Sequence, residues 1–256
     1  MHRLFITALA CLSAINLYSQ ITYTFDQVIL NDNATPYIDK VSKLPITGIL
    51  TKYHENGQLA YEINIINGIA DGYEKSYYEN GQLLSEGSYK NDKFNGKYLV
   101  YYLNGKLEQE LNYKQGMLEG EGISYYENGQ LRGEGYFLNN LEEGLHKKYY
   151  ENGRLKDEVN YKNGKIDGLY KVYYENGQLE MDLIFMMDKL EGVGEWYYKN
   201  GQLKSRQNFM NGDRAGICQW FHENGQLSYE INIINGIIIE KSKCWDEDGY
   251  SRPCED

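Results

Sequence analysis

The sequence predicts an all-β fold, an elongated single-layer antiparallel meander of about eight 24-residue hairpin repeats that is twisted or curled. The first observation is an Asn-Gly turn that returns at one fixed interval. Its glycines are Gly57, Gly81, Gly105, Gly129, Gly153, Gly177, Gly201 and Gly225. Self-similarity at a period of 20 to 50 residues is the signature of a repeat array, whose units bury their apolar faces against their neighbours.

Two further columns keep the same step. One is a second series of glycines, at Gly48, Gly72, Gly96, Gly120, Gly144, Gly168, Gly192 and Gly216. The other is a second turn signal, at Asn67-Gly68, Asn91-Asp92, Gln115-Gly116, Asn139-Asn140, Asn163-Gly164, Met187-Asp188, Asn211-Gly212 and Asn235-Gly236. Asn-Gly between aromatic and β-branched residues predicts a hairpin, because a type I′ turn needs positive φ at both central residues. Two turns per unit predict about sixteen strands.

A two-residue loop at each turn fixes the register and therefore the two faces. Such a loop at Asn80-Gly81 places Tyr78 opposite Leu83 and Ser76 opposite Ser85. One face then collects the leucines and the second tyrosine of each Tyr-Tyr pair, along with the aromatic residue before the second turn. The other face collects the first tyrosines, several lysines and the column Glu62, Glu86, Glu110, Glu134 and Glu158. The predicted sheet is amphipathic.

Residues outside the array are expected to cover its ends. The first and last units are rich in isoleucine, and an exposed apolar sheet edge invites aggregation. We therefore assign 20–47 to an N-terminal cap, 48–239 to the array, and 240–256 to a C-terminal cap with a degenerate ninth turn. Cys244 and Cys254 flank that turn; they either form a disulfide, which needs a bulge near Pro253, or remain free thiols. Cys218 is expected to be a buried free thiol.

Residues 1–19 have the pattern of a secretory signal peptide. Arg3 precedes the apolar stretch from Leu4 to Leu17, and cleavage is expected after Ser19. The stretch is too short for a membrane-spanning helix. A lipid anchor at Cys11 is disfavoured, because the apolar run before it is short. The mature chain is expected to be exported, to the periplasm, the outer surface or the medium.

The charge balance excludes some partners. Lys and Arg number 26 against 37 Asp and Glu, which gives a formal net charge of -11. No basic stripe is visible. Nucleic acid is therefore excluded as a partner, and an anionic membrane surface is disfavoured.

No group of residues converges on catalysis. His54 and His222 occupy the slot that holds the second tyrosine in other units, and they lie many strands apart, so a metal site is not expected. Successive glutamates of one column stand ~9.6 Å apart, too far to share a calcium ion. No Gly-rich phosphate loop precedes a helix. We expect no enzyme activity, no cofactor and no metal.

The units resemble the MORN-repeat variant found in many bacterial proteins, through their Tyr-Tyr-x-Asn-Gly-Gln-Leu and Tyr-Lys-Asn-Gly-Lys signatures. The resemblance covers roughly residues 44 to 240, and the opening Pro45-Ile46-Thr47-Gly48 is similar to the usual first repeat of the family. It implies an elongated single-layer sheet used for protein or lipid contacts. Some members of the family are described as antitoxins of toxin–antitoxin pairs.

These observations predict an exported, non-enzymatic repeat scaffold that binds another protein through its sheet face, with an antitoxin-like or immunity role as a narrower version. A self-associating structural component of the cell envelope is the alternative, and recognition of cell-wall glycan is a third. Tyrosine offers a large, amphipathic contact area. The predicted contact or self-association face is Tyr78, Tyr102, Tyr126, Tyr150, Tyr174 and Tyr198, with the leucine column beside them.

Overall fold

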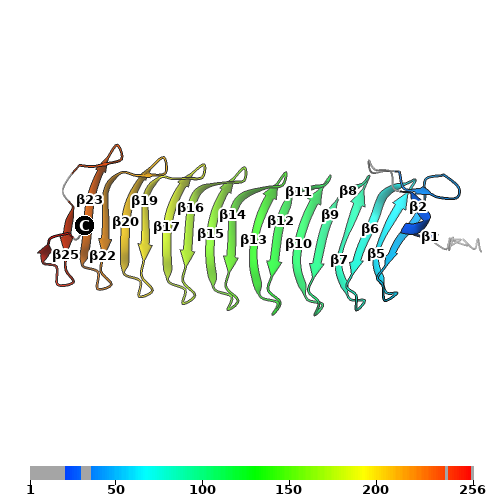
Figure 1. Ribbon diagram of the computed structural model, residues 1–256, viewed down its shortest axis with the longest axis horizontal. Coiled ribbons are helices and arrows are strands. Elements are labelled where there is room, and N and C mark those ends of the chain that lie inside the picture. The colour runs from blue at the N-terminus through cyan, green and yellow to red at the C-terminus, as the bar shows by residue number, and fades with distance from the viewer. Residues whose placement is uncertain (1–20, 30–35, 240–241, 255–256) are drawn as a thin grey trace, which may run out of the picture.

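The computed structural model describes residues 21–29, 36–239 and 242–254. Figure 1 shows one long row of strands, which confirms the predicted all-β meander. The strands of the array come in units, each with an upward strand, a loop and a downward strand. Their bounds are β4 Gly48–Tyr53, β5 Leu59–Ile66, β6 Ile69–Tyr77, β7 Leu83–Lys90, β8 Lys93–Phe94, β9 Gly96–Tyr101, β10 Leu107–Lys114, β11 Met117–Leu118, β12 Gly120–Tyr125, β13 Leu131–Leu138, β14 Leu141–Tyr149, β15 Leu155–Lys162, β16 Lys165–Tyr173, β17 Leu179–Met186, β18 Lys189–Leu190, β19 Gly192–Tyr197, β20 Leu203–Met210, β21 Asp213–Arg214, β22 Gly216–Phe221, β23 Leu227–Ile234 and β24 Ile237–Ile238.

Each long strand of the array pairs antiparallel with the next long strand, and the short strands β8, β11, β18, β21 and β24 each pair with the long strand before them. At the N-terminal end, β1 (Thr22–Thr24) adds to β4 in parallel. At the C-terminal end, β25 (Lys243–Trp245) and β26 (Ser251–Arg252) close the row. A separate two-stranded ladder joins β2 (Val28–Ile29) to β3 (Ile38–Asp39), after the 3-10 turn η1 (Phe25–Gln27). No helix in these described ranges is long and apolar enough to cross a membrane.

The second turn of each unit is the predicted two-residue turn. Asn91 and Asp92 have φ of 51° and 60°, and Asn67 and Gly68 have 51° and 77°. Positive φ at both central positions is the type I′ geometry. Even Met187 adopts φ of 49° here, although a long side chain gains nothing from that conformation. The hairpin therefore imposes the turn on whichever residue stands there.

The first turn differs from the prediction. Gly81 is in the left-handed region with φ of 82°, whereas Asn80 is not among the residues with positive φ. The Tyr78 amide donates to the Gln82 carbonyl and the Gly81 amide donates to the Tyr78 carbonyl. This is a three-residue loop, a type I turn followed by a left-handed glycine. The prediction of a two-residue loop at this turn was wrong.

The longer loop changes which side chains face each other. Tyr77, and not Tyr78, lies opposite Leu83, and a β-bulge between Ser76 and Tyr77 restores the predicted Ser76–Ser85 pair. The leucines thus align with the first tyrosines, so the predicted pairing of leucines with second tyrosines was wrong. The rest of each strand keeps the predicted register. The loop takes one extra residue from the first strand, and the bulge leaves one residue of the second strand unpaired, so the two shifts cancel.

The sheet has 24 strands and not about sixteen for two reasons. Strands β1, β24, β25 and β26 lie at its ends, and in four units the second glycine column separates a short strand, β8, β11, β18 or β21, from the strand that follows. Gly96, with φ of 105°, interrupts the strand that follows the second turn, so that β7 pairs first with β8 and then with β9. Gly120 does the same for β11 and β12. A left-handed glycine bends a strand at little cost, and the repeated bend curves the array.

The two faces of the array are chemically distinct. The face that carries Leu50, Ile63, Val159 and Leu183 is called the apolar face, and the face that carries the glutamate column is called the charged face. Opposite partners across the strands, such as Leu50 and Ile63 or Lys75 and Glu86, belong to the same face. The predicted amphipathic sheet is present.

The leucine column, however, lies opposite the first tyrosines, as Leu83 does opposite Tyr77, and Tyr77 donates to Glu62 of the charged face. The prediction that the leucines lie on the face away from the glutamates was therefore wrong.

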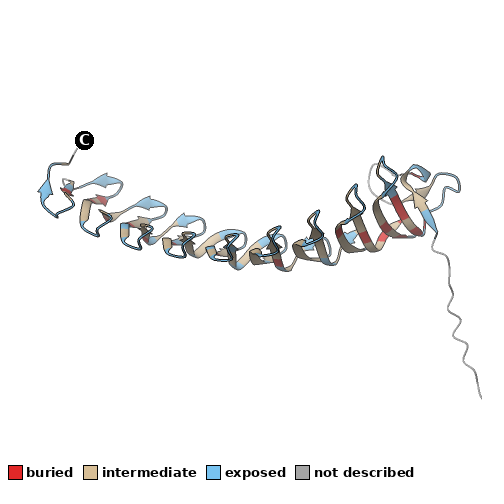
Figure 2. Ribbon diagram, turned by 90° about the horizontal axis from the view of Figure 1, so that it is seen from below, coloured by how far each residue is buried: buried red, intermediate tan, exposed pale blue. Residues whose placement is uncertain are grey.

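The buried core is concentrated near the two ends of the array, and Figure 2 shows the bowed ribbon with buried segments most frequent near the N-terminal end. The larger cluster joins the predicted N-terminal cap to the first units and consists of Val28, Ile46, Leu50, Ile63, Ile65 and Ala70. The smaller one contains Cys218, Ile231 and Ile233. A single-layer sheet leaves its middle strands half-exposed, because nothing packs across them.

The ends also hold the cysteines. Cys244 and Cys254 form a disulfide that closes the last hairpin, and Cys218 is a buried free thiol. The predicted signal peptide, 1–19, and the lipidation candidate Cys11 lie outside the described residues.

Candidate binding surface

The second tyrosines, which form the predicted contact face, are tied into the scaffold. Each hydroxyl donates to the backbone carbonyl of the residue 23 positions later, at the end of the corresponding strand in the next unit. The donors and distances are Tyr78 2.8 Å, Tyr102 2.7 Å, Tyr126 2.6 Å, Tyr150 2.7 Å, Tyr174 2.8 Å and Tyr198 2.8 Å. All six side chains are half-buried. They staple neighbouring units together, and their role in contacting a partner stays a prediction.

Histidine performs the same task in the terminal units. The Nε2 of His54 lies 2.9 Å from the Tyr77 carbonyl, and that of His222 lies 3.1 Å from the Trp245 carbonyl. Since a carbonyl oxygen only accepts, each imidazole donates. The two histidines thus replace tyrosine as inter-unit staples, which agrees with the structural interpretation of their slot.

Removing one staple should destabilise the array measurably. We expect Tyr126→Phe to lower the free energy of unfolding by about 1 kcal/mol, because the Tyr149 carbonyl loses its partner while the ring stays in place. Urea denaturation followed by circular dichroism measures the change. Tyr250→Phe is the control, because that side chain is 72% exposed. Equal midpoints for Tyr126→Phe and the unaltered chain would show that the staple contributes nothing.

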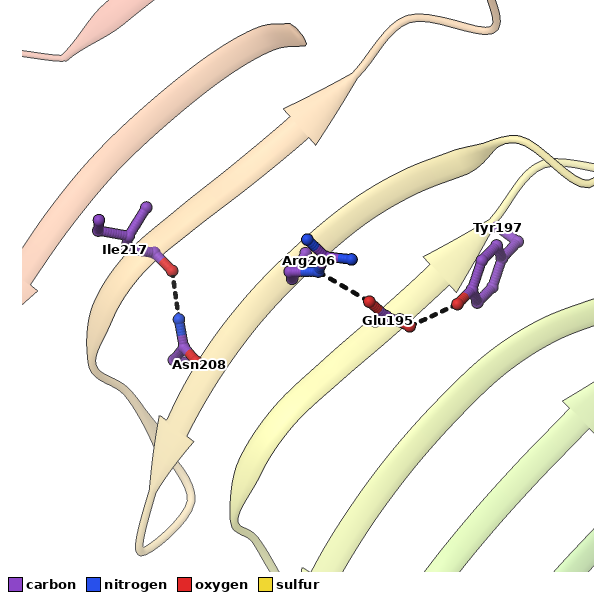
Figure 3. A network of polar contacts seen from close by, with 5 residues as sticks. All are labelled: Glu195, Tyr197, Arg206, Asn208 and Ile217. Carbon is purple, nitrogen blue, oxygen red and sulfur yellow. Dashed lines mark hydrogen bonds and ion pairs between the residues drawn. The ribbon is translucent and has the colours of Figure 1, made fainter. Parts of the chain in front are cut away.

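The charged face carries a ladder of paired charges along its middle row. Lys75 lies 3.7 Å from Glu86, Lys171 3.3 Å from Asp182, and Arg206 2.7 Å from Glu195. Figure 3 shows the last pair, with Tyr197 donating to the other oxygen of Glu195. The charged side chains of these pairs neutralise one another within the chain, so they offer few unpaired charges to a partner.

First tyrosines complete this ladder. Tyr101 donates to Glu86 and Tyr149 to Glu134, at 2.8 and 2.7 Å. Partial burial raises the pKa of Tyr101 to about 12, and the hydrogen bond to Glu86 adds to the rise. These phenols are therefore neutral donors at physiological pH. The arrangement confirms that first tyrosines and glutamates share one face.

The apolar face is hollowed at the fourth unit. Gly122 lies opposite Gly135, so neither strand contributes a side chain there. A hollow of about 390 Å³ opens beside these glycines, and the rings of His146 and Phe137 fill the space directly over them. It is lined by Leu111, Phe137, His146, Val159 and Tyr161, among others. The volume falls within the range of ligand-binding sites, ~300–1,000 Å³.

Aromatic rings lie close against the glycine backbone around the hollow. A Cβ atom on Gly135 would stand 2.1 Å from Nδ1 of His146, and one on Gly122 would stand 2.7 Å from Cε2 of Phe137. The His146 ring packs edge-on against both Phe137 and Tyr161, with centroids 5.3 and 5.0 Å apart. Nε2 of His146 donates to the Tyr136 carbonyl. The hollow therefore has a fixed aromatic wall.

Basic side chains border the same hollow on a protein that is acidic overall. Arg132, Lys148 and Lys156 line it, and both lysines are exposed. The Lys156 ammonium lies over the Tyr150 ring, 5.7 Å from its centroid. Asp157 is buried beside them, and its burial raises the pKa of the carboxyl although Lys148 and Lys156 oppose the rise. Glu134 and Glu142 also line the hollow, so the site combines apolar walls with a border of mixed charge that includes two exposed lysines.

Sequence reasoning did not find this hollow, although a signal was present. In the other units the matching pair has at least one side chain, for example His146 opposite Val159 or Glu74 opposite Gly87. The fourth unit alone has glycine at both positions, 13 residues apart. Comparison of the variable positions between units, and not of the consensus, would have located it.

The match to a protein-family model decides the relationship. The MORN repeat variant model matches eight consecutive segments, at residues 46–67, 70–91, 94–115, 118–139, 142–163, 166–185, 190–211 and 214–235. The chain belongs to the MORN repeat variant family. Each MORN segment contains two long strands and the Asn-Gly loop between them. Seven of the eight segments end at the first residue of the type I′ turn, and segment 166–185 ends two residues before it. The predicted resemblance is confirmed.

Similarity to solved structures is low. A chain of the Photorhabdus luminescens Tc holotoxin pore matches with 11% identity and a TM-score of 0.24, over 84% of this MORN chain and 14% of that one. A TcdB2–TccC3–Cdc42 crystal structure matches with 12% identity and a TM-score of 0.20, over 88% and 13%. This chain thus spans about one seventh of the chains it matches. No curated protein matches the sequence.

Metal ligands do not gather anywhere in the described ranges of this MORN array. No three His, Cys, Asp or Glu side chains there are grouped so that they could hold an ion. His146, the nearest candidate, has Glu142 at 3.9 Å and otherwise contacts aromatic rings and a carbonyl.

Proposed function

We propose that this MORN protein is an exported, non-enzymatic scaffold that binds another protein through its apolar face. The hollow beside Gly122 and Gly135 carries the proposal, because it is a concave aromatic site in the middle of an extended surface. Binding energy at interfaces concentrates where a large side chain enters such a pocket. The protein presents the hollow on a rigid sheet, so little ordering entropy opposes binding.

The border of the hollow indicates the chemistry of the partner. Arg132, Lys148 and Lys156 line the hollow beside its apolar walls, and the two lysines are exposed whereas the acidic Asp157 is buried. A partner that inserts an aromatic or aliphatic side chain and has acidic groups beside it would complement both features. Immunity toward an exported toxin is the narrower form of this proposal. Export itself rests on the signal-like pattern of residues 1–19.

Charge reversal at the border tests the proposal. Purified products of the neighbouring genes are titrated against the mature chain by calorimetry. For a product that binds, Lys148→Glu/Lys156→Glu should weaken affinity at least ~10-fold, since two exposed cations become anions at the contact. The matched control is Lys162→Glu/Lys189→Glu, which reverses two exposed lysines near the second turns.

The two outcomes separate the parts of the proposal. Binding that both double variants leave unchanged would place the contact away from the hollow. Absence of binding by every neighbouring gene product, with correctly folded protein, would count against a partner of this origin and against immunity in particular.

A further inference from the structure

The charged face bears a second feature, a row of exposed apolar side chains. We call it the apolar stripe, and its members are Tyr136, Leu145, Leu169, Ile184, Val193 and Ile217, which are 42–49% exposed. Leu145 and Val193 stand two residues before Lys147 and Glu195 of the charge ladder, so they point to the same side. Figure 3 shows Ile217 on the side of the Glu195–Arg206 pair.

Register places the stripe in one line across the sheet. Leu169 lies directly opposite Ile184, while Val193 and Ile217 lie opposite asparagines. From β13 to β22 the line is roughly 35 Å long at the usual strand spacing. More exposed apolar side chains extend it toward the second turns, namely Leu138 41%, Leu141 46%, Met186 59%, Met210 60%, Ile234 50% and Ile237 67%.

The fold does not require apolar residues at these positions. In the N-terminal units the same row holds Ser88, Lys97, Asn112 and Glu121, with the backbone register unchanged. Its large members there, Ile49 and Tyr73, are half-buried. The exposed large apolar residues of this row are confined to the half from β13 to β22, and an exposed apolar patch of this kind marks an interaction surface.

We propose that the apolar stripe pairs two copies of this chain face to face. The twelve side chains expose on the order of 1,000 Å² per copy, and a standard interface buries ~800 Å² per partner. Strand spacing sets the intervals along the stripe, so a second copy presents ridges at the same intervals, as in packed sheets. The same patch serves both copies, which gives a closed dimer.

Charges next to the stripe do not oppose this pairing strongly. Lys171 with Asp182, and Arg206 with Glu195, are already paired within each chain. The apolar face stays outward in such a dimer, so each copy keeps its own hollow accessible. The pairing therefore does not depend on the partner proposed for that hollow.

Sedimentation equilibrium of the mature chain, with its disulfide intact, tests the pairing without any other protein. We expect the unaltered chain to be a dimer, and Leu169→Lys/Ile184→Lys to raise the dimer dissociation constant roughly 100-fold or more. Ser88→Lys/Asn112→Lys is the matched control, because it places two lysines in the same row outside the stripe. It should dimerise as the unaltered chain does.

A monomer of the unaltered chain at all concentrations would overturn the proposal. So would dimerisation of the double lysine variant at unchanged affinity. Should that variant fail to fold by circular dichroism, Leu169→Ser/Ile184→Ser repeats the test with the residue that the row itself uses at Ser88. Loss of partner binding with retained dimerisation would contradict the proposed function and leave this inference standing.

Discussion

Replacing Leu50 by alanine should lower the free energy of unfolding by about 3–5 kcal/mol. Leu50 is 0% exposed at the centre of the larger core cluster, opposite Ile63 and beside Tyr23 of the parallel strand β1. Buried leucine-to-alanine changes cost this much because the transfer free energy is lost and a cavity remains. The large effect also reflects the architecture, since few residues of a single-layer sheet are fully buried.

Urea denaturation monitored by far-ultraviolet circular dichroism measures this loss, with Leu103→Ala as the control. Leu103 is 55% exposed, so its truncation should change stability by less than ~0.5 kcal/mol. The N-terminal units should melt first in the Leu50 variant, because repeat arrays are stabilised by contacts between neighbours. A shift of equal size in both variants would show that the core cluster does not anchor the array.

Glu74→Gln should raise the free energy of unfolding by about 1–3 kcal/mol at neutral pH. Glu74 is 5% exposed on the apolar face, and its Oε2 has no hydrogen-bond partner among the described residues. Its other oxygen is 3.5 Å from the Ser76 hydroxyl. A buried ionised carboxylate without a partner costs more than a neutral amide in the same place.

The pH dependence provides the sharper test. Burial raises the pKa of the Glu74 carboxyl, so the folded chain keeps the proton over a range in which the unfolded chain releases it. Below about pH 4 both states are protonated and the two proteins should be equally stable. As pH rises from there, the unaltered chain loses stability and the advantage of the variant grows.

Exposed Glu79→Gln controls for the general loss of one negative charge. A stability difference between Glu74→Gln and the unaltered chain that is constant from pH 4 to 7 would show that the carboxyl titrates normally.

Much of this fold could be predicted from the sequence, because the 24-residue period repeats the residues that determine the turns. Asn67-Gly68 and its equivalents were correctly predicted as type I′ turns, since this two-residue hairpin turn is the one with positive φ at both central residues, which Asn and Gly tolerate. The alternation of side chains along a strand correctly predicted that Tyr101 and Glu86 lie on the same face of the sheet. The Cys244–Cys254 pair, which the sequence left open, is formed.

The first turn shows where pattern alone was insufficient. Asn80-Gly81 has the same residue types as Asn67-Gly68, yet Asn80 avoids positive φ and Glu79 joins the loop. The Asn80 side chain accepts from the Gln82 amide, and the equivalent Asn56 also donates to a carbonyl of the next unit. The longer loop is thus accompanied by a local bond to the amide two residues later and, at seven of the eight turns, by a bond to the next unit, which a short window of sequence does not contain.

The sequence by itself determined the period, the alternation of faces and the positions of the turns, because these depend on backbone conformations that one or two residues dictate. Only the tertiary structure decided which side chains remain free. The second tyrosines are engaged by the next unit, the Gly122–Gly135 pair opens a hollow, and the apolar stripe stays exposed. Exposure depends on what packs across a residue, and in a single-layer sheet most positions have nothing across them.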